Sequence, residues 1–181
     1  MQARSKSLPT VAVFFFFLAL AIVFAAPISL SPGDVAANDG DPLHISWILA
    51  WDAHQLPRNP SRLFESNAFF PYHSSLAFSE HFVGLAILAA PVFYLSGNAL
   101  LAQNVALLLT LALSGTAMYL LFSEVFERRD AAVVAGLVYV FHTYNFHEVP
   151  RFQLLSIQWM ALALLLGLSI PQSDCACSSG R

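Results

Sequence analysis

Long apolar runs divide this chain and limit the folds that are open to it. Four of them are predicted membrane spans, at about 8–26, 99–122, 131–144 and 154–170. Of the 181 residues, 57% are hydrophobic and only 10% are charged, whereas soluble domains carry about 25% charged residues. A charge-poor apolar segment of about 20 residues has the length of a helix that crosses a bilayer. The sequence therefore predicts an all-α, polytopic helical membrane protein with about four transmembrane helices.

The first apolar run follows Arg4 and Lys6, so it is either a cleaved signal peptide or a retained span. At about 19 residues it is longer than the apolar core of a signal peptide, which has roughly 7–15. We predict a retained span with the N-terminus in the cytoplasm. The chain is then a multi-pass protein of the cell's inner (plasma) membrane.

A polar loop, 28–80, separates the first run from the rest and contains a predicted interfacial helix at 42–56. Asp41 is the expected N-cap of this helix, and Pro42 suits its first turn. Trp47 and Trp51 lie one turn apart on the same face. Tryptophan is typical of the membrane–water interface, where the indole N–H stays hydrated.

The charges near the membrane give a prediction of topology. Arg128 and Arg129 should lie on the same side as Arg4 and Lys6, which requires an even number of crossings between them. The segment 81–96 is short and contains Pro91, so we predict that it is a juxtamembrane or re-entrant helix rather than a span. The loop 28–80 and the polar stretch 142–151 then share the outer face.

The C-terminal segment 171–181 consists mainly of small polar residues and is predicted to be an unstructured tail. Its Cys175 and Cys177 are too close in sequence for an easy disulfide, and no second pair exists to form a zinc site. The chain has no basic run, so nucleic acid is not an expected partner. The expected partner is the lipid bilayer.

Several short motifs, taken in order, resemble bacterial multi-pass glycosyltransferases of the GT-C superfamily, akin to protein O-mannosyltransferases and lipid A aminoarabinose transferases. They are Gly40-Asp41-Pro42-Leu43, Trp47-Ile48-Leu49-Ala50-Trp51, His54, Phe69-Phe70-Pro71, Ala77-Phe78-Ser79-Glu80-His81, Gly97-Asn98, Tyr144 to Gln153 and Gln158-Trp159. The resemblance predicts that residues 1–170 are the N-terminal part of a GT-C-like transmembrane domain. Family members are several times longer, so the chain is expected to be a fragment that is inactive alone.

The resemblance implies a transferase that takes a sugar from a polyprenyl-phosphate donor. In such enzymes an acidic residue of the first outer loop is the general base, and acidic or histidine residues of the loops bind a divalent metal or the lipid phosphate. Asp41 matches the early-loop aspartate and Glu80 the acidic residue that closes the loop. His142 and His147 are looser matches, predicted to bind substrate.

Elementary chemistry gives a parallel reading of the carboxylates. Sugar transfer needs a carboxylate to take the acceptor proton and a cationic group for the leaving phosphate. Asp39 and Asp41 flank one glycine and could face a common point as base and ligand, or could simply form a turn and a cap. Glu80 could bind substrate or complement the dipole of the next helix. Asp39, Asp41 and Glu80 are the candidate ligands of a divalent metal.

The second polar stretch offers further candidates. His142 lies about 18 Å along a helix from Asp130, at 1.5 Å per residue, so it is predicted to sit within the membrane and to face a cavity or a polar partner. Arg151 could bind a lipid phosphate through two hydrogen bonds, or could be an ordinary interfacial arginine. Two other classes remain open: a non-catalytic membrane fragment or pseudogene product, and a transporter subunit. Against a transporter, the spans 99–122 and 154–170 contain no charged residue.

Overall fold

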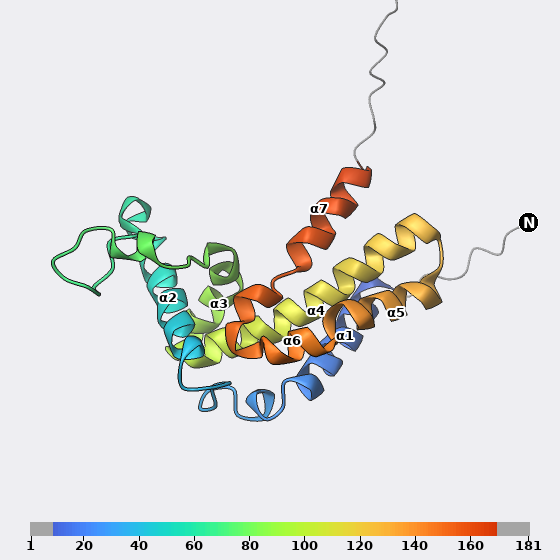
Figure 1. Cartoon of the computed structure of the whole chain (residues 1–181), viewed down its shortest axis with the longest axis horizontal. Coiled ribbons are helices and arrows are strands. Elements are labelled where there is room, and N and C mark those ends of the chain that lie inside the picture. Colours follow the sequence, from blue (N-terminus) through green and yellow to red (C-terminus); the bar gives the residue numbers. More distant parts are fainter. Residues whose placement is uncertain (1–8, 170–181) are drawn as a thin grey trace, which may run out of the picture.

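The computed structural model describes residues 9–169, and helices are the only regular secondary structure in that range. The all-helical fold class is therefore confirmed (Figure 1). The predicted tail at 171–181 lies outside the described residues, and so do Arg4 and Lys6.

The α-helices follow one another along the chain with short connections. They are α1 (Thr10–Phe24), α2 (Asp41–Gln55), α3 (Val83–Ser96), α4 (Ala99–Phe126), α5 (Arg129–Val140), α6 (Thr143–His147) and α7 (Gln158–Ser169). Between them lie the 3-10 segments η1 (Ile28–Leu30), η2 (Pro60–Arg62), η3 (Ser75–Phe78) and η4 (Val149–Leu155). The predicted helices at 42–56 and 81–96 correspond closely to α2 and α3.

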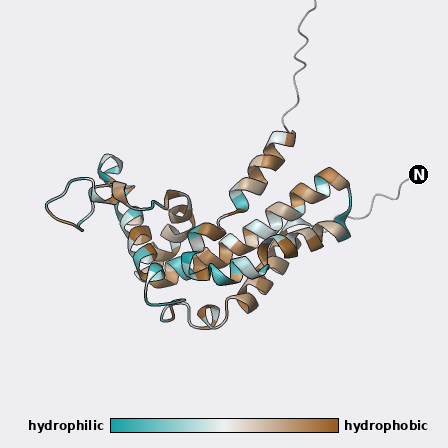
Figure 2. Ribbon diagram, in the orientation of Figure 1, coloured by the Kyte–Doolittle hydropathy of each residue, from teal (hydrophilic) through white to brown (hydrophobic). Residues whose placement is uncertain are grey.

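Helix α4 is the central element, and α1, α2, α3, α5 and α7 all pack against it. Asn98 caps its first turn, because the Asn98 side chain accepts a hydrogen bond of 3.0 Å from the backbone N–H of Leu101. One apolar cluster joins α4 to α2 and α3, and a second joins it to α1 and α5 around the buried Phe17. Figure 2 shows the hydrophobic residues concentrated along these helices.

Two glycines allow α1, α4 and α5 to meet closely. A Cβ atom at Gly136 of α5 would lie 2.9 Å from the carbonyl oxygen of Gly115 on α4, and it would overlap the ring of Phe17 from α1. At Gly115 a Cβ atom would meet the same ring. The absence of side chains at these positions therefore makes room for Phe17.

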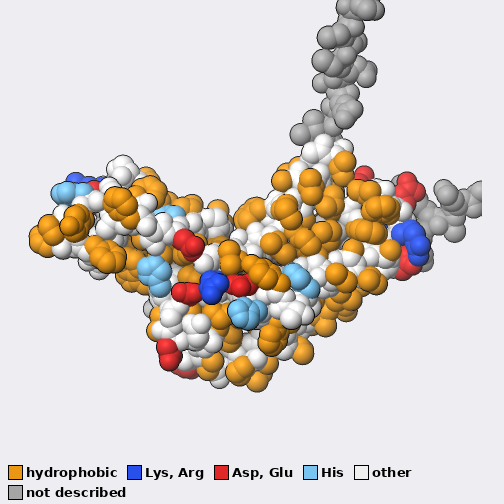
Figure 3. Space-filling view, in the orientation of Figure 1, with side chains coloured by type: hydrophobic (Ala, Val, Ile, Leu, Met, Phe, Trp, Pro, Cys, Tyr) orange, Lys and Arg blue, Asp and Glu red, His pale blue; other side chains and the backbone are white. Residues whose placement is uncertain are grey.

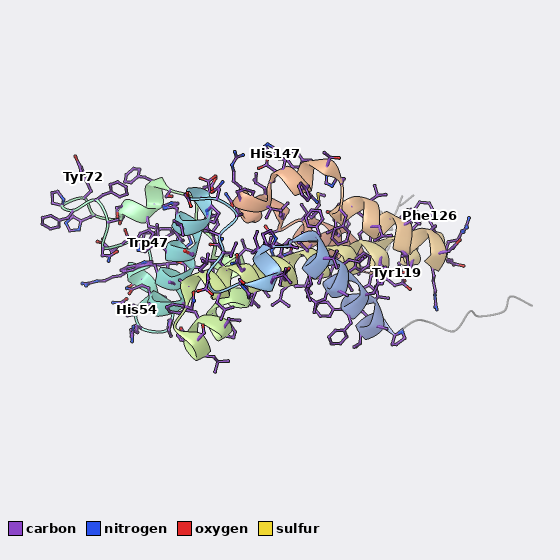
Figure 4. The ribbon with its side chains drawn as sticks, turned by 90° about the horizontal axis from the view of Figure 1, so that it is seen from below. Trp47, His54, Tyr72, Tyr119, Phe126 and His147 are labelled. Carbon is purple, nitrogen blue, oxygen red and sulfur yellow. The ribbon has the colours of Figure 1, made fainter. Side chains whose placement is uncertain are left out.

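The helices give the molecule two different ends. The start of α1 lies at the same end as the turn between α4 and α5, which carries Arg128 and Arg129 (Figure 1). Helix α2 and the loop that follows it lie at the opposite end, where Figure 4 shows Trp47, His54 and Tyr72, far from Tyr119 and Phe126 of α4. Helices α1 and α4 thus run in opposite directions.

Helix length supports one of the four predicted spans. Within the described range, only α4, with 28 residues, is long and apolar enough to cross a membrane. The helices at the other three positions, α1, α5 and α7, have 15, 12 and 12 residues. Pro9 and Pro27 flank α1, and the 3-10 segment η4 occupies the residues before α7.

Candidate functional site

One face of α2 contacts polar residues of the loops that surround it. Asp41, His44, Ile48 and Asp52 follow at intervals of three or four residues, so they share a side of the helix. The sequence predicted Asp41 as the N-cap, but this prediction is wrong. Gly40 occupies that position, and no side chain caps the helix. Asp41 is the first helical residue, and its carboxylate is free to bind another element.

That other element is the segment that follows α6. The Nε of Arg151 donates a hydrogen bond of 3.1 Å to Oδ2 of Asp41, and its Nη1 donates one of 3.0 Å to Oε2 of Glu148. The backbone of Arg151 leaves helical geometry inside η4. Glu148 is almost completely buried, whereas the side chains of Asp41 and Arg151 are about half exposed. Arg151 thus joins a buried and an accessible carboxylate.

Two further contacts join the end of the first loop to the same region. The side-chain amide of Gln153 donates a hydrogen bond of 2.8 Å to Oε2 of Glu80. Nε2 of His44 lies 3.3 Å from the hydroxyl oxygen of Ser79. Residues separated by up to 110 positions in the sequence therefore meet at one place.

These side chains surround a cavity of about 330 Å³, lined by Asp41, His44, Ile45, Ser79, Glu80, Phe82, Arg151 and Gln153. Its lining contains two carboxylates and one guanidinium, with Glu148 behind them. Figure 3 shows a basic side chain flanked by acidic ones on this face. The arrangement offers hydrogen-bond acceptors for hydroxyl groups and one cation for an anionic group.

Two other cavities adjoin this one because they share lining residues with it. A cavity of about 400 Å³ also borders Glu80 and Gln153 and extends to His81 and Trp159. A groove of about 560 Å³ also borders His44 and Ser79, and its other walls are mainly aromatic, from Trp47, Phe69, Tyr72 and Phe78. The polar cavity thus lies between a mixed and an apolar neighbour.

Not every predicted site residue joins the cavity. Asp39 is exposed and does not line it. His142 is exposed just after α5 ends at Val140, and its ring lies beside that of Tyr144. His147 is exposed at the edge of the molecule in Figure 4, with Nδ1 3.3 Å from Oε1 of Glu148. The structure therefore gathers Asp41, Glu80 and Arg151, and it leaves Asp39 and His142 outside.

Asp39, Asp41 and Glu80, the predicted metal ligands, are not grouped around one point in the described residues. Between residues 9 and 169, no three His, Cys, Asp or Glu side chains are grouped closely enough to hold an ion. Asp41 is engaged by Arg151, and Glu80 by Gln153. A divalent metal therefore stays a prediction, and we derive no chemical step through one.

The sequence reasoning overlooked a buried pair, Asp52 and His81. Asp52 is completely buried, and its Oδ1 lies 3.4 Å from Nε2 of His81. Burial raises the pKa of Asp52 from 3.8 to about 7, and burial also lowers the pKa of His81. The only signal of this pair in the sequence is the position of Asp52, which lies among apolar residues on the same side of the predicted helix as Asp41.

Glu148 and Gln153 were overlooked for another reason. They lie beside recognised candidates, but nothing in the sequence shows that Glu148 turns inward or that Gln153 reaches Glu80.

No protein-family model, curated protein or solved structure matches this chain. Its functional assignment therefore rests on its own residues and their geometry.

Proposed function

We propose that this chain is a membrane glycosyltransferase, or part of one, that moves a sugar from a polyprenyl-phosphate donor to an acceptor at the outer face. The observation that carries the proposal is the contact between Asp41 and Arg151. This contact supports the proposal because Asp41, the predicted base, and Arg151, the predicted phosphate ligand, line one cavity.

The proposed reaction assigns a separate task to each of these groups. The acceptor hydroxyl oxygen forms a bond to the anomeric carbon and gives its proton to the Asp41 carboxylate. The bond from that carbon to the phosphate oxygen breaks, and its electron pair leaves with the phosphate. Arg151 stabilises this developing charge. Its Nη2 group takes no part in the bonds to Asp41 and Glu148, so it can face the phosphate.

The remaining polar groups suit recognition of a sugar. The Glu80 carboxylate and the Gln153 amide offer acceptors and donors for hydroxyl groups on the cavity wall. Glu148 holds Arg151 from its buried side, and His147 contacts Glu148 in turn. His142 receives no role in this mechanism because it lies outside the cavity.

The outward faces of the helices support a location in the membrane. Large apolar side chains on α1, α5 and α7 are exposed, which is unusual for a soluble monomer. They are Val11, Phe15, Phe16, Val23, Val134, Val138, Met160, Leu164, Leu166 and Leu168. With the α4–α5 turn in the cytoplasm, the opposite end and its cavity face outward.

The test measures release of undecaprenyl phosphate, which does not require knowledge of the acceptor. Because the chain is expected to be inactive alone, the assay uses membranes containing the full-length transferase of which it is proposed to be part, incubated with undecaprenyl-phosphate glucose, mannose or aminoarabinose. We expect release from one of these donors, and a decrease of about 10²–10⁴-fold in Asp41→Asn, because that change removes the base at nearly constant size. Asp34→Asn is the matched control, since Asp34 is exposed in the same loop and outside the cavity.

Two results would contradict the proposal. One is the absence of release from all three donors by the correctly inserted, full-length wild-type transferase. The other is full activity in Asp41→Asn, which would remove Asp41 from the chemistry. Asp39→Asn separates the two aspartates, and we expect it to behave as the Asp34→Asn control does.

A further inference from the structure

The segment 79–82 carries Glu80 into the cavity, yet it belongs to no helix. It connects η3 to α3, and the backbone of Ser79 is extended. Backbone hydrogen bonds hold its two ends, Ser79 and Phe82, so the positions of Glu80 and His81 between them depend on contacts of their side chains. Ser79 meets His44, Glu80 meets Gln153, and His81 meets Asp52.

The third of these contacts is the buried one. Asp52 is completely buried, and the side chain of His81 is 15% exposed. The ring of His81 also packs edge-on against Phe64, with centroids 4.9 Å apart. Asp52 lies two turns along α2 from His44, about 12 Å at 1.5 Å per residue. The same helix face thus holds the segment at two points.

The polar atoms of this pair have no alternative partners. Within residues 9–169, neither carboxylate oxygen of Asp52 and neither ring nitrogen of His81 makes a hydrogen bond, either to the other residue of the pair or to any other group. Buried polar groups without partners are costly and rare in native proteins. The distance of 3.4 Å between Oδ1 and Nε2 is slightly longer than an ordinary hydrogen bond. A hydrogen bond between Oδ1 and Nε2 would give both of these atoms a partner.

We propose that Asp52 and His81 are a positioning pair, in which the protonated Asp52 carboxyl donates a hydrogen bond to Nε2 of His81 and thereby holds Glu80 in the cavity. The raised pKa of Asp52 and the lowered pKa of His81 both favour this neutral form. The inference rests on the proposed function only where it concerns activity. The placement of Glu80 can be measured without a substrate.

The experiment uses the Gln153 side-chain amide as a reporter, because that group donates to Glu80. The chain is labelled with ¹⁵N-glutamine in detergent micelles, and the Gln153 signal is identified by its loss in Gln153→Leu. In the wild type we expect slow exchange of the bonded amide proton. Asp52→Asn should preserve this, since the asparagine amide can also donate to Nε2. Asp52→Leu has similar size and cannot donate, so it should accelerate exchange about tenfold or more.

A matched variant protects the test against misfolding. If Asp52→Leu does not insert into micelles, His81→Phe keeps the packing on Phe64 while removing the acceptor, and it should accelerate exchange in the same way. Unchanged exchange in the inserted Leu or Phe variant would show that the pair only fills the core, and the inference would be wrong. Equal acceleration in Asp52→Asn would also overturn it, because the hydrogen bond would then not be what matters.

The transfer assay gives a second and separate readout. Misplacing a binding group by about 1 Å can cost about 10²-fold in rate. When Glu80 is present, we expect Asp52→Leu to lower the rate of undecaprenyl phosphate release by up to that factor. When Glu80 has already been changed by Glu80→Gln, adding Asp52→Leu should not lower the rate further. If no donor is turned over by the wild type, the proposed function fails, while the exchange measurement still decides whether the pair positions Glu80.

Discussion

Replacing Asp52 with asparagine should change how the stability of the chain depends on pH. Burial raises the pKa of Asp52 from 3.8 to about 7, with no contribution from another charged group. His81 is the titratable side chain that faces it. A carboxyl whose pKa rises on folding takes up a proton when the chain folds between these two pH values. Its contribution to stability is therefore complete below pH 3.8 and is lost as the pH rises to about 7.

The size of this effect follows from the two pKa values. One pKa unit corresponds to about 1.4 kcal/mol, so the difference amounts to about 4 kcal/mol at pH 8. Asparagine does not titrate and avoids this loss. The lowered pKa of His81 acts in the opposite direction below its usual value of 6.5, but it is present in both proteins and largely cancels from the comparison.

Thermal unfolding in detergent, followed by tryptophan fluorescence, measures the difference. For a chain of this length, 1 kcal/mol corresponds to about 2–4 °C in Tm. Asp52→Asn should therefore unfold at nearly the same temperature as the wild type at pH 4, and about 8–16 °C higher at pH 8. Asp34→Asn, on the exposed loop, should show no such divergence. A constant difference between Asp52→Asn and the wild type from pH 4 to pH 8 would refute the reasoning.

Two further predictions concern topology and packing. Cysteines at the exposed positions Asn67 and Thr143 should react with an impermeant reagent from outside, and one at Glu124 should not; the reverse pattern at Thr143 and Glu124 would reject the two-crossing arrangement. Gly136→Ala should lower the free energy of unfolding by about 1–3 kcal/mol, because its Cβ overlaps Phe17, whereas Gly167→Ala should be nearly neutral, since nothing lies within 4 Å of it. Equal Tm values for the two alanine variants would contradict the close packing.

The positions of the helices were predictable because their signals are local. A continuous apolar run predicts α4, and the sequence Gly97-Asn98 predicts where α3 ends and α4 begins. In the structure Gly97 adopts the left-handed conformation that ends α3, and Asn98 caps α4. The length of α1 was overestimated because its apolar run continues past the end of the helix at Phe24 to Pro27.

The candidate site was only partly predictable because its contacts are not local. Asp41 and Arg151 could be named from their residue types and from the prediction that their loops share one face of the membrane. Whether Asp39 or Asp41 enters the cavity depends on one step of backbone geometry at Gly40, which places Asp41 on the helix and leaves Asp39 before it. The Asp52–His81 pair depends on the packing of α2 against α3, which no local pattern reveals.

Helix α2 explains why a buried carboxylate and an accessible one are useful on the same face. The site must hold Glu80 on an irregular segment and Arg151 on a distorted 3-10 turn, and neither backbone is rigid by itself. A helix is rigid, so two contacts along it fix the segment beside it. Asp41 binds Arg151 at the solvent-exposed start of α2, where its half-exposed carboxylate would remain available to the proposed substrate. Asp52 contacts His81 further along the helix, at a buried position. Exclusion of water there strengthens the hydrogen bond proposed between them. The distance between the two aspartates, about 16 Å along the helix, keeps the proton held by Asp52 separate from the proton that Asp41 is proposed to accept.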